Sequence, residues 1–99
     1  MPKNIVWSPL AEKDFENILI YLRDNWNEMV LDNFIDITDN MIFQILSNPK
    51  QFPLIHKKIK VRKCVLTKHN TLFYRVRRDA IEILRIYDTR QDPDKLEFK

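Results

Sequence analysis

The residues best suited to chemistry lie in the last third of the 99-residue chain. Lys68 and His69 are adjacent, Arg75 follows, and Tyr87 and Arg90 come later. Lysine and arginine can stabilise the charge of a phosphate, and histidine or tyrosine can transfer protons. Such a set could cleave RNA without a metal ion, by activating the 2′-hydroxyl and protonating the leaving oxygen. His69 is nevertheless more typical of a polar turn, and Tyr87 of an aromatic residue at a strand end.

The densest basic segment is HKKIKVRK, from His56 to Lys63. In a strand, Lys58, Lys60 and Arg62 would project from one face. Together with Lys63, that face could follow the phosphate backbone of DNA or ribosomal RNA. The alternative is an outer strand whose lysines prevent pairing with the sheets of other molecules. The sequence supports the two interpretations about equally, and these four cations are the candidate nucleic-acid or target-binding residues.

The charge of the chain is divided unevenly along its length. The net charge is +3, but residues 1–49 contain three Lys/Arg against eight Asp/Glu, and residues 50–99 contain fourteen against six. This division modestly favours a positive surface in the second half that faces an anionic partner. The alternative, in which the two halves neutralise each other across the fold, stays open.

Composition excludes several classes of protein. Glycine is absent, which argues against P-loops, dinucleotide-binding turns and nucleophile elbows, because their backbones need it. Cys64 is the only cysteine, so no internal disulfide forms, as expected in a reducing cytoplasm. No apolar run reaches the roughly 20 residues that cross a bilayer, and the first residues show no apolar core followed by a small-residue cleavage site, as a signal peptide would. We therefore expect a cytoplasmic protein without a membrane partner.

Other kinds of site have little support in the sequence. Ser8 and Ser47 fall at predicted helix ends, which argues against a serine nucleophile. A metal site would have to use His56 and His69 with scattered carboxylates, and their spacing matches no metal motif. We expect neither a metal nor another cofactor.

Two helices are predicted in the first half. After a strand over residues 3–7, Ser8 can cap a helix and Pro9 suits its first position. Two apolar stripes with helical spacing follow: Ala11, Phe15, Ile18, Leu22 and Trp26, widened by Leu19; then Phe34, Ile37, Met41 and Ile45, widened by Leu31, Ile42 and Leu46. The second helix must stop near Asn48, because Pro49 disfavours helical geometry in the preceding residue. The short connection predicts an antiparallel helical hairpin.

The second half predicts a sheet. Residues 49–57 read as a loop, and extended patterns follow over residues 59–67, 71–76 and 80–88, as in an antiparallel meander. The last pattern is apolar at both parities, which indicates a central strand. Asn25, Asn48 and Asn70 fall at predicted boundaries, where asparagine can replace glycine in left-handed backbone conformations. The prediction is one α+β domain over residues 1–99, with the order β-α-α-β-β-β and the hairpin packed on a small, mainly antiparallel sheet.

Three stretches together resemble the RelE/ParE toxins of bacterial type II toxin–antitoxin systems. They are SPLAEKDFENILIYLRDNW, KVRKCVLTKHNTLFYRV and IEILRIYDTRQDP, taken with their order, their spacing and the length of the chain. The resemblance implies this family's fold and a small cytoplasmic toxin, which a cognate antitoxin neutralises in a hetero-oligomer. RelE-like members cleave messenger RNA on the ribosome, whereas ParE-like members poison DNA gyrase.

The resemblance also bears on residue roles. Arg90 lies where many members of both branches carry an arginine after the last strand. Thr67 occupies a position where RelE-like nucleases tend to have arginine, and Leu96 and Phe98 stand where they tend to have a catalytic aromatic residue or histidine. Lys68 could replace the missing arginine, and His69 or Tyr87 could serve as the acid.

Three functions are therefore open at this stage. The first is a non-enzymatic, ParE-like toxin that binds gyrase. The second is a RelE-like, ribosome-dependent and metal-independent endoribonuclease that uses Lys68, Arg75 and Arg90, with His69 as a further candidate. The third is an inactive partner-binding module. The antitoxin is expected to lie along the helical hairpin or to add a strand to the sheet, with exposed apolar residues as its contacts: Ile20, Ile35 and Phe43.

Overall fold

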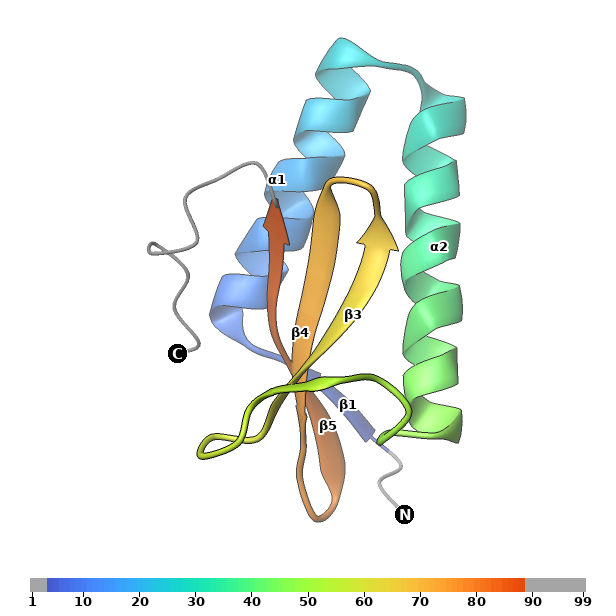
Figure 1. Cartoon of the computed structure of the whole chain (residues 1–99). Helices are drawn as coiled ribbons and strands as arrows, with labels where there is room; N and C mark the ends of the chain where they lie inside the picture. Colours follow the sequence, from blue (N-terminus) through green and yellow to red (C-terminus); the bar gives the residue numbers. More distant parts are fainter. Residues whose placement is uncertain (1–3, 89–99) are drawn as a thin grey trace.

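The computed structural model describes residues 4–88, and its architecture is the predicted α+β fold (Figure 1). Two helices pack on a five-stranded sheet of order β1-β5-β4-β3-β2, in which β1 and β5 are parallel and the other neighbours antiparallel. The elements are β1 (Asn4–Trp7), α1 (Pro9–Asn25), α2 (Glu28–Ser47), β2 (Leu54–His56), β3 (Val61–Thr67), β4 (Asn70–Val76) and β5 (Ala80–Asp88).

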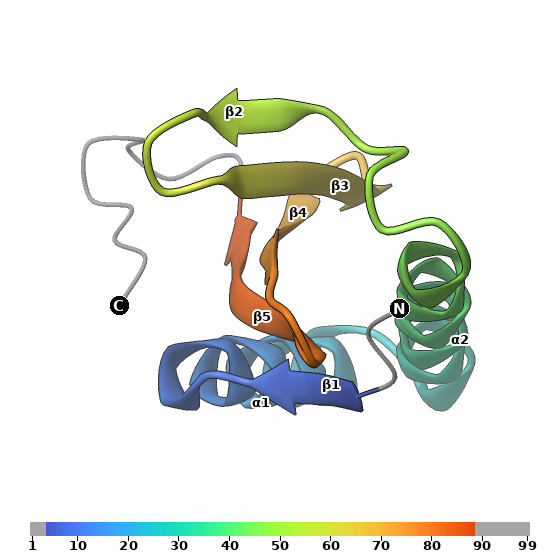
Figure 2. The same cartoon turned by 90° about the horizontal axis from the view of Figure 1, so that it is seen from below.

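The strand β2 was not predicted, because its segment was read as a loop. It pairs with β3 through Leu54 opposite Arg62, at the edge of the sheet opposite β1 (Figure 2). The Arg62 guanidinium donates to the carbonyl of Phe52 at 2.8 Å and to that of Lys50 at 3.3 Å. A three-residue strand beside two prolines has no periodicity to detect, so only pairing with β3 reveals it. The strand predicted over residues 59–67 also begins later than expected, because β3 starts at Val61.

Ser8 connects the start of α1 to the sheet. Its Oγ accepts a hydrogen bond from the Ala11 amide at 3.0 Å, as an N-cap does, and donates to the Leu84 carbonyl at 2.7 Å. Its own amide donates to the Ile83 carbonyl at 2.9 Å. Ser8 therefore caps the helix as predicted and, in addition, satisfies the edge of β5 where β1 has ended.

The predicted stripe of α1 is confirmed except at its end. Ala11 is fully buried, and Phe15, Ile18 and Leu22 pack against the core. Trp26 is 62% exposed, because the helix ends at Asn25 and Trp26 adopts a non-helical conformation with φ −129°. A residue outside the helix no longer follows its periodicity.

The second helix begins and ends as its sequence predicts. The Asn27 side chain accepts from the Val30 amide at 3.0 Å, and the last helical residue is Ser47, before Asn48 and Pro49. The three asparagines fall at element boundaries as predicted, since Asn25 ends α1, Asn48 follows α2 and Asn70 begins β4. The expected left-handed conformation was wrong, because Asn48 has φ −149°, which is extended backbone. Among residues 4–88, the residue with a left-handed φ is Lys60, at 57°.

Strand β5 is an inner strand with both faces buried, as its apolar pattern predicted. Phe73 lies opposite Arg85 and Tyr74 opposite Ile83, so Leu84 is the extra residue of a β-bulge. Ile81, Ile83 and Ile86 belong to the main core beneath the helices. A second, separate hydrophobic cluster is formed by other buried side chains of the sheet: Val61, Phe73, Leu84 and Tyr87. The bulge explains why apolar residues occur at both parities.

Both helices lie along the sheet and run antiparallel to each other, which confirms the predicted hairpin (Figure 1). Within residues 4–88, no helix combines the length and the apolar character that a membrane crossing needs.

Candidate functional site

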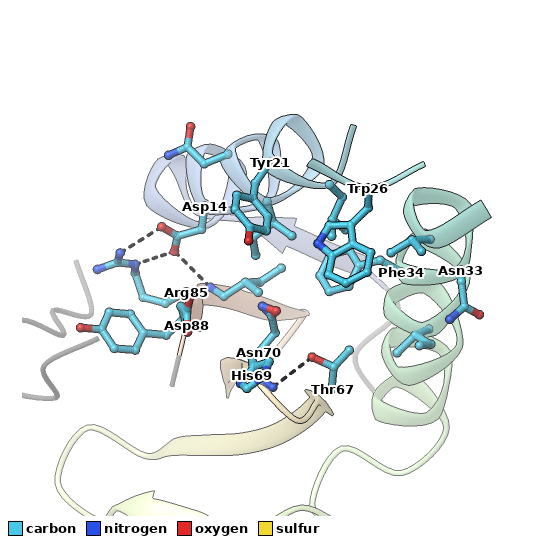
Figure 3. A pocket seen from close by; sticks show the side chains of 17 residues that line it. Asp14, Tyr21, Trp26, Asn33, Phe34, Thr67, His69, Asn70, Arg85 and Asp88 are labelled. Carbon is cyan, nitrogen blue, oxygen red and sulfur yellow. Dashed lines mark hydrogen bonds and ion pairs between the residues drawn. The ribbon is translucent and has the colours of Figure 1, made fainter. Parts of the chain in front are cut away.

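A cavity of about 570 Å³ opens between α1, α2 and the end of the sheet at the β3–β4 turn (Figure 3). The helices supply most of its apolar lining together with Asp14, Asn17 and Asn33, and the sheet supplies mainly polar side chains. The apolar lining residues include Ile18, Leu22, Val30, Phe34 and Ile37. The cavity is lined by residues of both helices, of the β3–β4 turn and of β5.

Asp14 of α1 holds the edge of β5 at this cavity. Its carboxylate accepts from Arg85 Nε at 2.7 Å, from Arg85 Nη2 at 3.0 Å and from the Ile86 amide at 3.1 Å. The two side chains are only 16% and 15% exposed, and the guanidinium carbon lies 5.8 Å from the centre of the Tyr87 ring. This fork-like pair is strong, and it matches the positive charge of Arg85 with a carboxylate.

The turn between β3 and β4 brings two of the residues that the sequence analysis singled out to the cavity. Thr67 and His69 both line it, and the His69 amide donates to Thr67 Oγ1 at 3.3 Å. His69 lies in the turn, as its polar character suggested. Tyr87 lines the same cavity from β5, beside Asp88. Two groups that could transfer protons therefore share one recess.

Arg75 lies far from that turn. It sits opposite Glu82, and its Nη2 lies 2.8 Å from Glu82 Oε1, while Arg77 Nε lies 3.2 Å from the same oxygen. Five residues of strand separate Arg75 from Asn70, or about 17 Å at 3.3–3.4 Å per residue. The structure consequently separates Arg75 from the candidates near His69.

Glu82 is the shared partner of these two arginines. Its partial burial raises the pKa of the carboxyl, but hydrogen bonds and charge from Arg75 and Arg77 outweigh burial and lower the pKa on balance. Glu82 is therefore ionised at neutral pH and neutralises part of the charge of this pair.

Arg90, Leu96 and Phe98 lie outside the described residues. The last described residue, Asp88, pairs with Asn70 in the sheet and lines the cavity. The role that the resemblance gives to Arg90 therefore stays a prediction.

The basic segment does not form the single strand face that the sequence predicted. Residues 57–60 make the turn between β2 and β3, with Lys60 in a left-handed conformation. Lys58 and Lys60 are therefore turn residues, exposed to solvent. Arg62 points back to the carbonyls of the 50–52 loop, and Lys63 is exposed on β3. The turn was missed because its lysines have no turn signature without glycine, proline or asparagine.

The apolar residues proposed as partner contacts differ in exposure. Ile20 is 39% exposed and Phe43 68%, whereas Ile35 is half-buried. Two further large hydrophobic residues are exposed at the tip of the hairpin: Trp26, and Met29 at 79%. Met29 was not predicted as a contact, and Trp26 was predicted to belong to the apolar stripe of the first helix.

Two buried titratable groups, Cys64 and Tyr74, have raised pKa values. Burial raises the pKa of the Cys64 thiol to about 11. Burial also raises the pKa of Tyr74 to about 12, with a lowering contribution from Arg62 and a raising one from Cys64. The Tyr74 hydroxyl donates to the Pro49 carbonyl at 2.6 Å. Within residues 4–88, no three His, Cys, Asp or Glu side chains gather as a metal site would require.

Comparison with solved structures defines the class of the fold. The chain is similar to a chain of the chromosomal ParDE toxin–antitoxin system from Pseudomonas aeruginosa, with a TM-score of 0.71, 17% identity and coverage of 86% of this chain and 94% of that one. The chain is also similar to the YoeB/ParE toxin from Agrobacterium tumefaciens, with a TM-score of 0.65, 15% identity and coverage of 87% of this chain and 98% of that one. A chain of the DinJ–YafQ toxin–antitoxin complex from Escherichia coli is similar with a TM-score of 0.61, 12% identity and coverage of 89% of this chain and 93% of that one. The fold is that of RelE/ParE-like toxins.

The sequence identifies the family within that class. The sequence model for the ParE toxin of the type II toxin–antitoxin system parDE matches residues 5–93. The chain therefore belongs to the ParE toxin family of type II toxin–antitoxin systems, as the resemblance of its three stretches implied. A search among curated proteins finds no match.

Proposed function

We propose that this toxin acts without catalysis, by binding DNA gyrase, and that a cognate antitoxin neutralises it. The match to the ParE toxin family over residues 5–93 supports this choice over a nuclease. The observation that carries the proposal is that the candidate cations for phosphate chemistry are divided between two ends of the sheet.

The electrostatics of the cavity argue in the same direction. A scissile phosphate needs positive charge that is not already matched by carboxylates. Asp14 and Asp88 both line the cavity, and Asp14 holds the guanidinium of Arg85 in a fork-like pair. Thr67 is neutral, and Arg75 lies at the other end of β4, paired with Glu82. This is a poor environment for a phosphodiester about to gain charge.

Two assays test the proposal with the purified toxin. We expect inhibition of gyrase supercoiling and no new cleavage of ribosome-bound messenger RNA in primer extension. Arg90→Ala should weaken the inhibition, and Arg23→Ala, an exposed α1 cation paired with Asp24, serves as the matched control. Ribosome-dependent cleavage without any effect on supercoiling would refute the proposal.

A ribosome-dependent endoribonuclease is the second candidate function. The observation that favours it is that His69 and Tyr87, two groups able to transfer protons, line the same cavity. Under this alternative, Arg90→Ala and Lys68→Ala should each abolish cleavage while the protein keeps its circular dichroism spectrum. Retained cleavage in both variants would remove this mechanism.

Growth on induction separates both from an inactive partner-binding module. A DNA damage response indicates gyrase as the target, and translation arrest indicates the ribosome. Unimpaired growth with soluble, folded toxin would favour the inactive module.

We propose that the antitoxin segment lies along the helical hairpin or adds a strand to the edge of the sheet. The support is the exposure of apolar side chains there, including Ile20 and Phe43, since grooves and faces of this kind bind amphipathic segments. Hydrogen exchange should slow along α1 and α2, or at a sheet edge, when the antitoxin is added. Unchanged exchange at the hairpin and at both edges would contradict the proposal.

A further inference from the structure

Two turns bring basic residues from separate parts of the chain to one end of the sheet. The turn between β2 and β3 contains Lys57, Lys58 and Lys60, and the turn after β4 contains Arg77 and Arg78. Figure 1 shows both turns at the lower end of the molecule, away from the α1–α2 connection, and Figure 2 shows them on different sides of the twisted sheet, with the turn after β4 beside β1.

The strand register explains why the two turns share this end. Val61, the first residue of β3, lies opposite Arg75, and Arg75 lies opposite Glu82 near the start of β5. Neighbouring strands are about 4.8 Å apart. Lys60, which precedes Val61, therefore lies about one strand spacing from the end of β4, although 15 residues separate it from Arg75 in the sequence. We call this surface the basic end: Lys57, Lys58, Lys60, Arg75, Arg77 and Arg78.

The charges at the basic end are only partly matched. Six cations stand beside two carboxylates, Asp79 and Glu82, and the same Glu82 oxygen pairs with both Arg75 and Arg77. Five of the six cations are exposed, while Arg75 is half-buried. A surplus of positive charge is therefore directed to solvent.

The helices carry the opposite charge. Residues 9–25 and 28–47 together contain eight Asp/Glu against two Lys/Arg, Lys13 and Arg23. The uneven charge of the sequence thus becomes a spatial separation, with an acidic hairpin and a basic sheet end. An oriented field of this kind directs a polyanion to one end of the molecule.

We propose that the basic end binds the phosphodiester backbone of a nucleic-acid duplex, without sequence preference. Exposed lysines and arginines on two separated turns can contact phosphates on a rigid duplex. Arg62, whose guanidinium is engaged by loop carbonyls, is not part of this surface. The surface lies at the opposite end of β4 from the cavity that Asp88 lines. The proposal does not depend on whether gyrase or the ribosome is the target, because the toxin alone should bind.

The decisive experiment is fluorescence anisotropy of the full chain with a 20-base-pair DNA duplex and a matched RNA duplex, over about 50–200 mM salt. Each phosphate contact contributes about 0.9 to the slope of log affinity against log salt for B-DNA. Lys58→Gln with Arg78→Gln removes one cation from each turn and should lower that slope by about 1.8. Across this fourfold range of salt, the wild type should then lose about twelvefold more affinity than the variant.

The control removes the same residue types from the acidic hairpin. Lys13→Gln with Arg23→Gln gives the same net charge and should leave the slope unchanged. The proposal is supported if the toxin binds either duplex and only the Lys58/Arg78 variant lowers the salt slope. The duplex that binds more tightly shows whether the natural ligand is DNA or RNA. Absence of binding to both duplexes at 50 mM salt, or an equal fall in slope for the control, overturns it. If the double variant unfolds, Lys58→Gln alone should lower the slope by about 0.9.

Discussion

The carboxylate of Asp14 should be one of the most important polar groups for the stability of this toxin. It connects α1 to β5 through Arg85 and the Ile86 amide, with distances of 2.7–3.1 Å. Asp14→Ala removes this acceptor from a site where both side chains are about 85% covered by protein. The edge of β5 is held there by a side chain, because β1 has already ended at Trp7.

The cost follows from the kind of bonds that are lost. Hydrogen bonds to charged groups contribute about 1.5–3 kcal/mol, and an amide left without its acceptor adds about 1 kcal/mol. Breaking a fully buried ion pair costs about 3–5 kcal/mol, and the residual exposure of this pair lowers that figure. We expect Asp14→Ala to lower the free energy of unfolding by about 2–3 kcal/mol.

Urea denaturation followed by circular dichroism measures the effect. With an m value of about 1.5 kcal/mol/M, the midpoint should fall by about 1.3–2 M. Asp14→Asn retains one neutral acceptor, so its midpoint should lie between those of the wild type and Asp14→Ala. Glu16→Ala is the control, because Glu16 and Lys13 form an exposed pair at 3.5 Å and such pairs contribute about 0.5 kcal/mol. A midpoint for Asp14→Ala equal to that of Glu16→Ala would refute the reasoning.

Three further predictions concern titratable groups. Because its pKa rises from 9.0 to about 11, the Cys64 thiol should react with a thiol reagent at pH 8 at least about a hundredfold more slowly than in urea; equal rates would contradict its burial. Glu82 has a lowered folded pKa, so its contribution to stability is present above its ordinary pKa and is lost as the pH falls through the folded value. Glu82→Gln should therefore flatten the acid side of a urea-midpoint profile, and an unaltered profile would exclude this linkage. Tyr74→Phe removes the 2.6 Å hydrogen bond to Pro49 and should cost about 1 kcal/mol in urea unfolding; a neutral result would show that the bond contributes nothing.

The helices were predictable because their signals are local. Ser8, Pro9 and Pro49 fix helix ends through groups a few residues away, and an apolar stripe needs only the helical period. The stripe failed at Trp26 because one residue of non-helical backbone removes the following side chain from the helix face. Local rules predict an element well and its last residue poorly.

The candidate site was less predictable than the elements that form it. The sequence drew attention to His69 and Tyr87, and both line the cavity. It also grouped Arg75 with them, although the register of β4 takes Arg75 to the far end and pairs it with Glu82. Which residues meet across strands depends on register, and a shift in register leaves the composition of the sequence unchanged.

The sequence by itself determined the α+β class, the order of the helices and the three long strands, and the resemblance to the toxin family. Periodicity, caps and prolines are sufficient for these features, because they act over a few residues. Only the tertiary structure decided that β2 pairs at the edge, that Leu84 forms a bulge and that Asp14 holds Arg85. It alone also placed the β2–β3 turn and the β4–β5 turn at the same end of the sheet, because pairing between distant strands decides which strand ends lie together.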